Sequence, residues 1–454
     1  KLKNTYRNRN VSVQKMFKII LYSLLLLVSS APANSEKVKE GENHFTKANA
    51  YTVKVKNRVK YPFIKDKKGS FSGAGFLIEK KLGWIVTNAH VSSRNPESLE
   101  VAFKDGKFIE AKLHYIDPLL DLAVIKIATE NVPDKAQVAK LDCENKPTIG
   151  SPAGAFGHPY SLSFSGTRGI ISGEKYKWGR VWVQTDAPIN RGNSGGPLIS
   201  LNSGKVVGIS SATLSKKRSE GLGFAVPMIH ACKVINLLKN GDDPSPSYIP
   251  VGFAYDDDNE SELVAAVIYK KLPLLWPLQV GDRLVALASN PKQEFENQAT
   301  LIHALRGVKG KVDVIIERSG KKMTLSITSE PRSNLMKRVG VHVSGVVIAS
   351  DTYRDDEEMN PNGLPMIHDV ASASIGSAAG INAYDLVISV DGNPTEDIPK
   401  LCKYLKNAES AKKKVKLITK ANKWSYRSRS MYGSHQIKVK DVKLVGPQVP
   451  KGCG

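Results

Sequence analysis

Three residues whose side chains can cooperate in acyl transfer occur in the first half of the chain, in the order His90, Asp121 and Ser194. Ser194 lies in Arg-Gly-Asn-Ser-Gly-Gly-Pro-Leu-Ile (residues 191–199), whose glycines let the backbone turn tightly and approach a bound substrate. His90 ends an apolar stretch that closes with Thr-Asn-Ala-His, and Asp121 opens the stretch Asp-Leu-Ala-Val-Ile. A serine nucleophile needs a base for its proton and a carboxylate that orients the base, so this order favours nucleophilic catalysis.

Each of these features has a simpler interpretation when it is taken alone. The glycine-rich segment is then a flexible turn with a surface serine, and the histidine is an ordinary polar residue with its hydrogen bonds satisfied. An aspartate just before a strand is usually a turn former. The three together within one β-rich segment favour the catalytic interpretation.

The elements that must position these residues are short strands separated by polar turns, which predict an all-β barrel domain over residues 49–241. The predicted strands cover residues 51–55, 70–78, 83–91, 99–103, 108–116, 122–127, 169–171, 180–185, 205–210 and 223–226. A helical pattern follows at residues 228–238 and ends in Lys-Asn-Gly, a common helix terminus.

Two smaller modules follow a linker at residues 242–247, which is rich in proline and serine. The first covers residues 248–332 and the second residues 336–446, with a C-terminal tail at 447–454. Both show a turn, a strand, a short helix and another strand in the same order, with predicted helices at residues 297–305 and 398–405. The second also carries a polar insertion at residues 351–362.

The N-terminal region has the pattern of a secretory signal over residues 1–33. Met16 is the better start of translation, because Lys18, an apolar run at residues 19–28 and Ala-Pro-Ala follow it. A retained membrane anchor is the alternative, although the apolar run is short for a span of about 20 residues. Residues 34–48 are polar and predicted to be flexible.

The charge of the chain is strongly basic, with 66 Lys and Arg against 43 Asp and Glu and a formal net charge of +23. These residues are scattered, and no nucleic-acid-binding signature accompanies them, so the charge does not favour a nucleic-acid partner. A soluble basic protein from a basic proteome, or one that works near anionic membranes as a peripheral association, is a better account.

The four cysteines, Cys143, Cys232, Cys402 and Cys453, form neither a Cys-x-x-Cys pair nor a Cys/His cluster with metal-ligand spacing. No metal site is predicted. Three pairings are open to four cysteines, and free thiols or one incidental bridge are both compatible with a chain of this size.

At this point the sequence resembles a known family. Thr-Asn-Ala-His, Asp-Leu-Ala-Val and Gly-Asn-Ser-Gly-Gly-Pro-Leu, with Gly-Leu-Gly-Phe-Ala-Val-Pro at residues 221–227, look like the HtrA/Deg family of serine proteases. The resemblance runs from about residue 50 to the C-terminus. It implies a mostly β chain: a chymotrypsin-like domain of two six-stranded barrels, then two PDZ-like α+β modules. It also implies trimers or multiples of trimers, and no cofactor.

The resemblance also implies a role for each catalytic position. His90 is the general base, Asp121 its orienting carboxylate and Ser194 the nucleophile. The oxyanion hole uses the backbone of Gly192 and Ser194, with Asn193 shaping the loop between them. The primary specificity pocket is lined by Leu222, Gly223 and Phe224. No acidic residue stands there, so the pocket is expected to take a small or medium apolar side chain.

Two regulatory segments of the family are short here. Residues 161–180 correspond to the activation loop that senses a ligand on the PDZ domain, and the short loop between Phe63 and Ser70 argues against cage-forming contacts.

The PDZ-like modules are expected to bind C-terminal peptides as an added strand. In the first module the candidate residues are Ile249, Val251, Gly252 and Phe253, where Pro250 removes one backbone donor. His303, in the predicted helix, is expected to be packed or solvated and not to read a ligand. The second module either binds a peptide or serves packing and assembly alone.

The functional hypothesis is an ATP-independent serine endopeptidase, exported to the periplasm, that degrades unfolded or damaged proteins under control of its PDZ domains. Its expected partners are unfolded proteins, C-terminal peptides and further copies of itself. The alternative is a non-proteolytic chaperone or PDZ scaffold with a vestigial protease domain.

Overall fold

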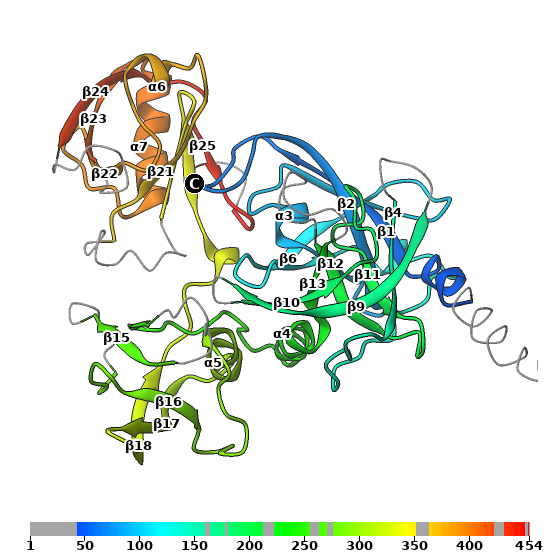
Figure 1. The fold of residues 1–454 in the computed structure, drawn as a ribbon. Helices are drawn as coiled ribbons and strands as arrows, with labels where there is room; N and C mark the ends of the chain where they lie inside the picture. Colours follow the sequence, from blue (N-terminus) through cyan, green and yellow to red (C-terminus); the bar gives the residue numbers. More distant parts are fainter. Residues whose placement is uncertain are drawn as a thin grey trace, which may run out of the picture.

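The computed structural model describes residues 43–158, 164–177, 180–211, 222–254, 263–269, 276–350, 363–421, 431–449 and 453. The first half of the chain forms two β-sheets, and three further sheets follow in the second half (Figure 1). The signal segment predicted over residues 1–33 lies outside the described residues. Across the described ranges, every helix is too short or too polar to cross a bilayer.

The start of the described chain corrects one expectation. Residues 43–48 form a short helix where the sequence predicts a flexible segment. The reason is a packing contact, since the ring of Phe45 stacks 6.2 Å from that of Phe156 and lies against the main hydrophobic core.

The first sheet has seven strands in the order β5-β4-β1-β2-β3-β7-β6. They are β1 (Thr52–Val59), β2 (Gly69–Glu79), β3 (Trp84–Thr87), β4 (Ser98–Phe103), β5 (Ile109–Glu110), β6 (Lys112–Asp117) and β7 (Leu122–Lys126). The edge strands β5 and β6 are consecutive in the chain, separated by Ala111 alone. The segment predicted as the single strand 108–116 is thus one bent strand that forms both edges of the sheet. The two edges therefore lie next to each other, and the sheet curves back on itself. The division at Ala111 explains why the count is seven and not the six that the resemblance implies.

The second sheet is a closed six-stranded barrel in the order β10-β13-β12-β11-β8-β9. Its strands are β8 (Pro152–Gly157), β9 (Ser165–Lys177), β10 (Arg180–Thr185), β11 (Pro197–Ser200), β12 (Val206–Ser211) and β13 (Gly223–Pro227). Strand β8 was not predicted, because all but its first residue are buried and it shows no polar alternation. Strand β9 is far longer than predicted and occupies most of the expected activation loop.

A helix and a disulfide close this double-sheet region. Helix α4 (Met228–Asn240) follows β13 directly and ends at Gly241, whose φ of 80° is left-handed and suits glycine. Cys232 on α4 is bonded to Cys143 in the segment that connects the two sheets. A second disulfide joins Cys402 and Cys453. All four cysteines are thus paired, where the sequence left free thiols or a single bridge open.

The first C-terminal module contains a two-stranded and a three-stranded sheet. Its elements are β14 (Val251–Phe253), β15 (Ala265–Ile268), β16 (Arg283–Leu287), α5 (Gln298–Leu305), β17 (Gly310–Arg318) and β18 (Lys321–Ser329). Helix α5 begins with a capping box, in which the Asn297 side chain accepts from the Thr300 N–H and the Thr300 hydroxyl accepts from the Asn297 N–H.

The second C-terminal module is built on one seven-stranded sheet in the order β24-β23-β22-β21-β20-β19-β25. Its strands are β19 (Gly340–Val343), β20 (Val346–Ala349), β21 (Met366–Val370), β22 (Leu386–Val390), β23 (Lys414–Lys420), β24 (Tyr432–Lys438) and β25 (Lys443–Val445). Helices α6 (Ile375–Ala378) and α7 (Ile398–Ser410) complete it. The predicted insertion at residues 351–362 lies outside the described residues.

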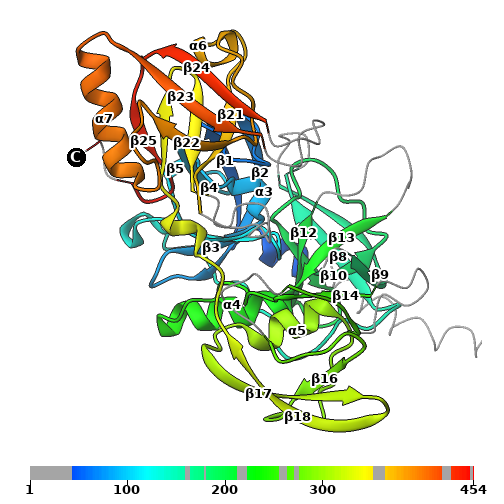
Figure 2. The same ribbon diagram turned by 90° about the vertical axis from the view of Figure 1, so that its left-hand side faces the viewer.

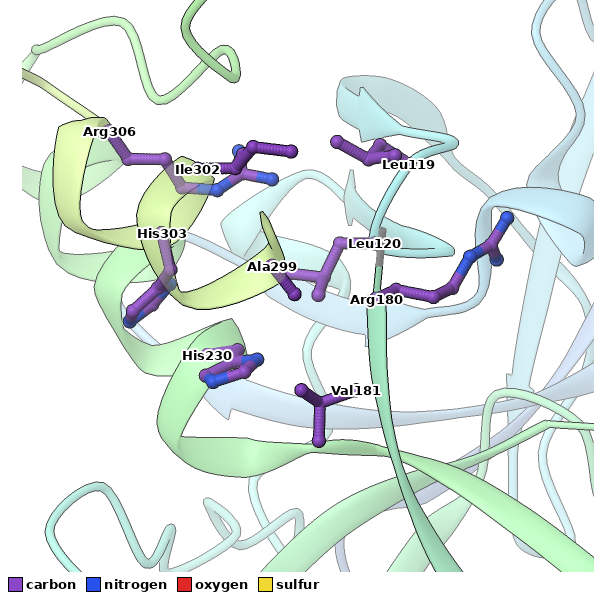
Figure 3. A pocket seen from close by; sticks show the side chains of 9 residues that line it. All are labelled: Leu119, Leu120, Arg180, Val181, His230, Ala299, Ile302, His303 and Arg306. Carbon is purple, nitrogen blue, oxygen red and sulfur yellow. The ribbon is translucent and has the colours of Figure 1, made fainter. Parts of the chain in front are cut away.

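The first module is fastened to the loop that leads into the predicted catalytic Asp121. Arg306, just after α5, forms a buried ion pair with Asp117, whose oxygen lies 2.6 Å from the guanidinium. Leu119 of the same loop packs against the core of the module. Figure 3 shows Arg306 and Leu119 at this junction, with His303 of α5 facing His230 of α4; the two imidazole rings lie 4.4 Å apart. His303 is thus packed, as expected.

We predict that Arg306→Met destabilises the protein by about 3–5 kcal/mol, because it leaves the carboxylate of Asp117 buried without its partner. Urea unfolding of the variant against the parent measures the loss. The matched control is Arg283→Met, which removes an ion pair with Glu317 in which both side chains are about one third exposed. A loss at Arg306 no larger than that of the control would contradict the prediction.

Candidate active site

His90 is held by a short helix that follows strand β3. Helix α3 (Ala89–Ser92) begins just after β3 ends at Thr87, so residues 89–91 are helical where the sequence predicts that the strand continues. The preceding Asn88 is fully buried, and its side-chain amide donates to the backbone carbonyl of Asp121 at 3.0 Å. Asn88 therefore ties the histidine and aspartate segments together before their side chains meet.

The His90 and Asp121 side chains are in direct contact. The imidazole Nδ1 lies 3.0 Å from each carboxylate oxygen of Asp121, and the backbone N–H of His90 donates to Oδ1 at 3.1 Å. Asp121 has a left-handed φ of 56°, which is uncommon for a residue with a side chain. This geometry fixes the ring so that Nε2 is the nitrogen left for another group.

Ser211 is a third partner of this pair that the sequence analysis missed. Its hydroxyl donates to Asp121 Oδ2 at 2.9 Å, and the serine is buried at the end of β12. Ser211 lies 90 residues beyond Asp121 in the chain and in the other sheet. No local motif marks it, because only the packing of the two sheets brings it to the carboxylate.

The pKa values of His90 and Asp121 are shifted in opposite directions. Burial alone would raise the pKa of Asp121, but the charge and hydrogen bonds of His90 and the hydroxyl of Ser211 hold that pKa below its ordinary value. Burial alone would lower the pKa of His90, but the charge and hydrogen bond of Asp121 raise it above its ordinary value. The carboxylate is thus ionised over the neutral range and favours a proton on the imidazole.

Ser194 is buried in the loop before β11, and the loop is held against the first sheet. The backbone N–H of Ala74 in β2 donates to the Ser194 carbonyl at 2.7 Å. The N–H of Gly195 donates to the backbone carbonyl of Ser210 in β12, also at 2.7 Å. Gly195 has a φ of 85°, and a Cβ there would lie 2.1 Å from the Ala74 carbonyl oxygen. Only glycine allows this approach of the serine loop to β2.

The residues predicted for the oxyanion hole lie in one tight turn. Gly192 has a left-handed φ of 105°, and the N–H of Asn193 donates to the Asn190 carbonyl at 3.0 Å. The Asn193 side chain is fully buried, and neither of its polar atoms has a hydrogen-bond partner among the described residues. A Cβ on Gly157 would lie 2.8 Å from the side-chain oxygen of Asn193, so the end of β8 packs directly on the turn.

The predicted pocket residues flank this turn on β13. Gly223 and Phe224 pair with Thr185 and Gln184 of β10, and Leu222 directly precedes the strand. A Cβ on Gly223 would lie 2.9 Å from the Ile189 side chain, in the loop that leads to the serine turn. The three predicted residues therefore lie together, and no carboxylate is among them.

The residues predicted to bind peptide in the first module lie apart from this site. Ile249, Val251 and Phe253 are buried in the core of that module, and Gly252 pairs with Val267 in the two-stranded sheet. Their backbone, and not their side chains, is what remains for a ligand. A cavity beside α5, shown in Figure 3, is lined by residues of α4, α5, β10 and the 117–121 loop. None of the predicted site residues lines it.

Comparison with known proteins points to one family. Residues 73–209, which include His90, Asp121 and Ser194, match the trypsin-like peptidase domain. A probable periplasmic serine endoprotease, DegP-like, of Pseudomonas putida (strain W619) is 32% identical over 276 residues, 56% of this chain and 55% of the relative. The chain thus spans about half the length of such DegP-like relatives.

Two further matches cover more of the similar protein. The serine endoprotease DegS of Salmonella typhimurium (strain 14028s) is 30% identical over 289 residues, which are 58% of this chain and 78% of the relative. The solved structure of the HtrA-type protease AlgW with tripeptide matches with a TM-score of 0.52 and 25% identity. That match covers 64% of this chain and 97% of AlgW.

We predict that the pKa of the His90 imidazole lies above its ordinary value in the native protein and falls in Asp121→Asn. The substitution removes the charge that raises the pKa of His90 and leaves the burial that lowers it. A proton NMR titration of the histidine signals, assigned with His90→Gln, measures both values. Asp313→Asn, on the exposed face of β17 in the first module, is the control and leaves the value unchanged. An unshifted His90 signal in Asp121→Asn would contradict the assignment of cause.

Proposed function

The chain belongs to the HtrA/Deg family of serine endoproteases, and we propose that it is itself a serine endopeptidase that acts without ATP on unfolded or damaged exported proteins. The proposal depends on one observation above all. His90 and Asp121 are in bidentate contact at 3.0 Å, and the loop of Ser194 is bonded by its backbone to the same sheet. A histidine so oriented is what a serine nucleophile requires.

In the proposed mechanism, Ser194 attacks the carbonyl of the scissile peptide bond and gives its proton to Nε2 of His90. Asp121 stabilises the imidazolium that forms, and Ser211 keeps the carboxylate in place. The tetrahedral oxyanion accepts hydrogen bonds from the backbone N–H groups of Gly192 and Ser194, with Asn193 fixing the turn between them. His90 then gives the proton to the leaving amine. In the second half, His90 takes a proton from the water that attacks the acyl-enzyme and returns it to the Ser194 oxygen as the acid product leaves.

We assign the protease domain to residues 49–241, the linker to 242–247, and PDZ-like domains to 248–332 and 336–446. The burial of an apolar core in each module supports this division. The glycine and the apolar side chains at Leu222, Gly223 and Phe224 support a preference for a small or medium apolar residue before the cleaved bond.

The place and partners of the protein are proposed from its relatives. The DegP-like relative is named as periplasmic, and both disulfides are consistent with export to an oxidising compartment. Unfolded proteins are the proposed substrates, peptides the proposed ligands of the modules, and a trimer or a multiple of trimers the proposed assembly. The net charge of +23 supports a peripheral contact with anionic membranes.

We predict that the chain cleaves reduced, denatured casein and that Ser194→Ala does not. Loss of the nucleophile lowers the turnover by roughly 10⁴-fold or more, to background, because no other group on the loop replaces the hydroxyl. Gel electrophoresis of a time course over a range of temperatures measures it.

Ser200→Ala is the matched control, since this serine lies at the far end of β11, and it keeps the parent activity. Casein left intact by both the parent and Ser194→Ala at every temperature would contradict the proposal. That outcome, combined with suppression of casein aggregation, would favour the non-proteolytic scaffold instead.

A further inference from the structure

Strand β25 occupies an unusual place in the second C-terminal module. It comes from the C-terminal end of the chain, yet it pairs antiparallel with β19, the first strand of the module, and lies outside it at the sheet edge. The pairing aligns Gly340 with Val445 and His342 with Lys443. Helix α7 contacts both β19 and β25, and Figure 2 shows β25 beside α7. The strand therefore lies at an edge that is flanked by a helix.

The first module pairs its C-terminal residues 330–332 with residues 246–248, just ahead of β14, so among the described residues the edge of β14 itself carries no such strand. Its β14 is equivalent to β19 by order in the chain, and α5 packs with β14 in one core. Among the described residues, β14 has β15 as its one sheet neighbour. An extended peptide binds PDZ domains by adding a strand at such an edge. In the second module the position of the ligand is thus taken by the chain itself.

The side chains of β25 are arranged as those of a bound peptide would be. Leu444, opposite Val341, points to the side of the sheet where α7 lies and packs against the module core. Its neighbours Lys443 and Val445 lie on the opposite face, as the two-residue period of a strand requires. One apolar side chain is thus inserted beside the helix.

Short tethers to α7 hold the segment on both sides. The N–H of Val442 donates to the carboxylate of Glu409 at 3.1 Å, and Lys406 approaches the Val442 carbonyl at 3.5 Å. Beyond the strand, Cys453 is bonded to Cys402 of α7. The strand itself has three residues and three aligned pairs. Its own pairing is weak, so the tethers raise its effective concentration at the edge.

The outward face of β25 is part of a contact with the protease domain. Val445, with Val347 and Ala349 of β20, packs against Phe63 in the loop between β1 and β2. Lys443 lies 4.9 Å from the ring centre of Tyr61. The backbone N–H of Ile64 donates to His368 of β21 at 3.2 Å. We call residues 61–66 the docking loop.

The docking loop is in turn bonded to the chain that leaves the catalytic helix. Asp66 forms a largely buried ion pair with Arg94 at 2.7 Å and also accepts from the Arg94 backbone N–H at 2.9 Å. The Asn95 side chain donates to the Tyr61 carbonyl at 2.8 Å. Arg94 and Asn95 follow α3, which carries His90, by two and three residues.

We propose that β25 is an internal ligand of the second module, which an extended peptide with an apolar residue at the Leu444 position displaces, and that its displacement releases the docking loop. The proposal rests on the peptide-binding role proposed for the modules, and its test measures binding and not cleavage. All proteins carry Ser194→Ala, so a failure here is distinct from a failure of the protease assignment.

The first experiment measures binding of a fluorescent peptide with the sequence of residues 443–449 by anisotropy. Leu444→Asp in the full chain and a chain that ends at Val442 both empty the edge, so each is expected to bind the peptide about tenfold or more tighter than the parent. Gln436→Asp, which adds the same charge on exposed β24 at the far edge of the sheet, is the control and binds like the parent.

The second experiment follows hydrogen exchange in the docking loop. The Ile64 amide is expected to exchange faster in Leu444→Asp, and also in Cys453→Ser with excess peptide, because Val445 no longer supports Phe63. If the edge-emptied chains keep the parent's circular dichroism but do not bind the peptide, β25 is a fixed strand and the proposal is wrong. If they bind the peptide with no change at Ile64, the coupling to the docking loop is wrong. If the shortened chain does not fold, Leu444→Asp and Cys453→Ser decide alone by the same two readouts.

Discussion

The close approach of the serine loop to strand β2 is the constraint on which the rest of the structure depends. Gly195 leaves no room for a side chain against the Ala74 carbonyl, and the Ala74 N–H binds the Ser194 carbonyl at 2.7 Å. Ser194, the proposed nucleophile, comes from the second sheet, and His90 and Asp121, the proposed base and carboxylate, come from the first. Any separation of the two sheets would therefore divide the site, and Ser211 gives Asp121 a hydroxyl across the same junction.

Residue type and local spacing were enough to find the parts of the site that are encoded in short motifs. His90 follows strand β3, which forms within the predicted residues 83–91, and Ser194 lies in the glycine-rich turn just before β11. Helix α5 was found because its apolar period and its Asn297 cap are both local signals. The sequence also predicts a single strand at 108–116. It does not predict the bend at Ala111, because that bend depends on closure of the sheet.

The parts that could not be predicted depend on contacts between distant segments. Ser211 is an ordinary strand-end serine in the sequence, and Asp117 is an ordinary turn former until Arg306, 189 residues later, is packed against it. Strand β8 is buried along nearly its whole length, so it lacks the alternation that marks a half-exposed strand. The cysteine pairing was open for the same reason, since spacing alone does not determine which thiols meet.

Both C-terminal modules contact segments that lie near the His90–Asp121 pair, and each module contacts a different segment. The first module contacts the segment that leads into Asp121 through the ion pair of Arg306 with Asp117 and through the packing of Leu119 against the module core. The second module contacts the docking loop, where the Ile64 N–H donates to His368. Asp66 of this loop pairs with Arg94, which lies just after the helix of His90. These charged and apolar contacts fall on the first sheet, while the Ser194 turn belongs to the second. If the modules bind ligands as proposed, a shift of the first module would disturb the segment before Asp121, and it would also disturb β10 of the second sheet, which α5 contacts.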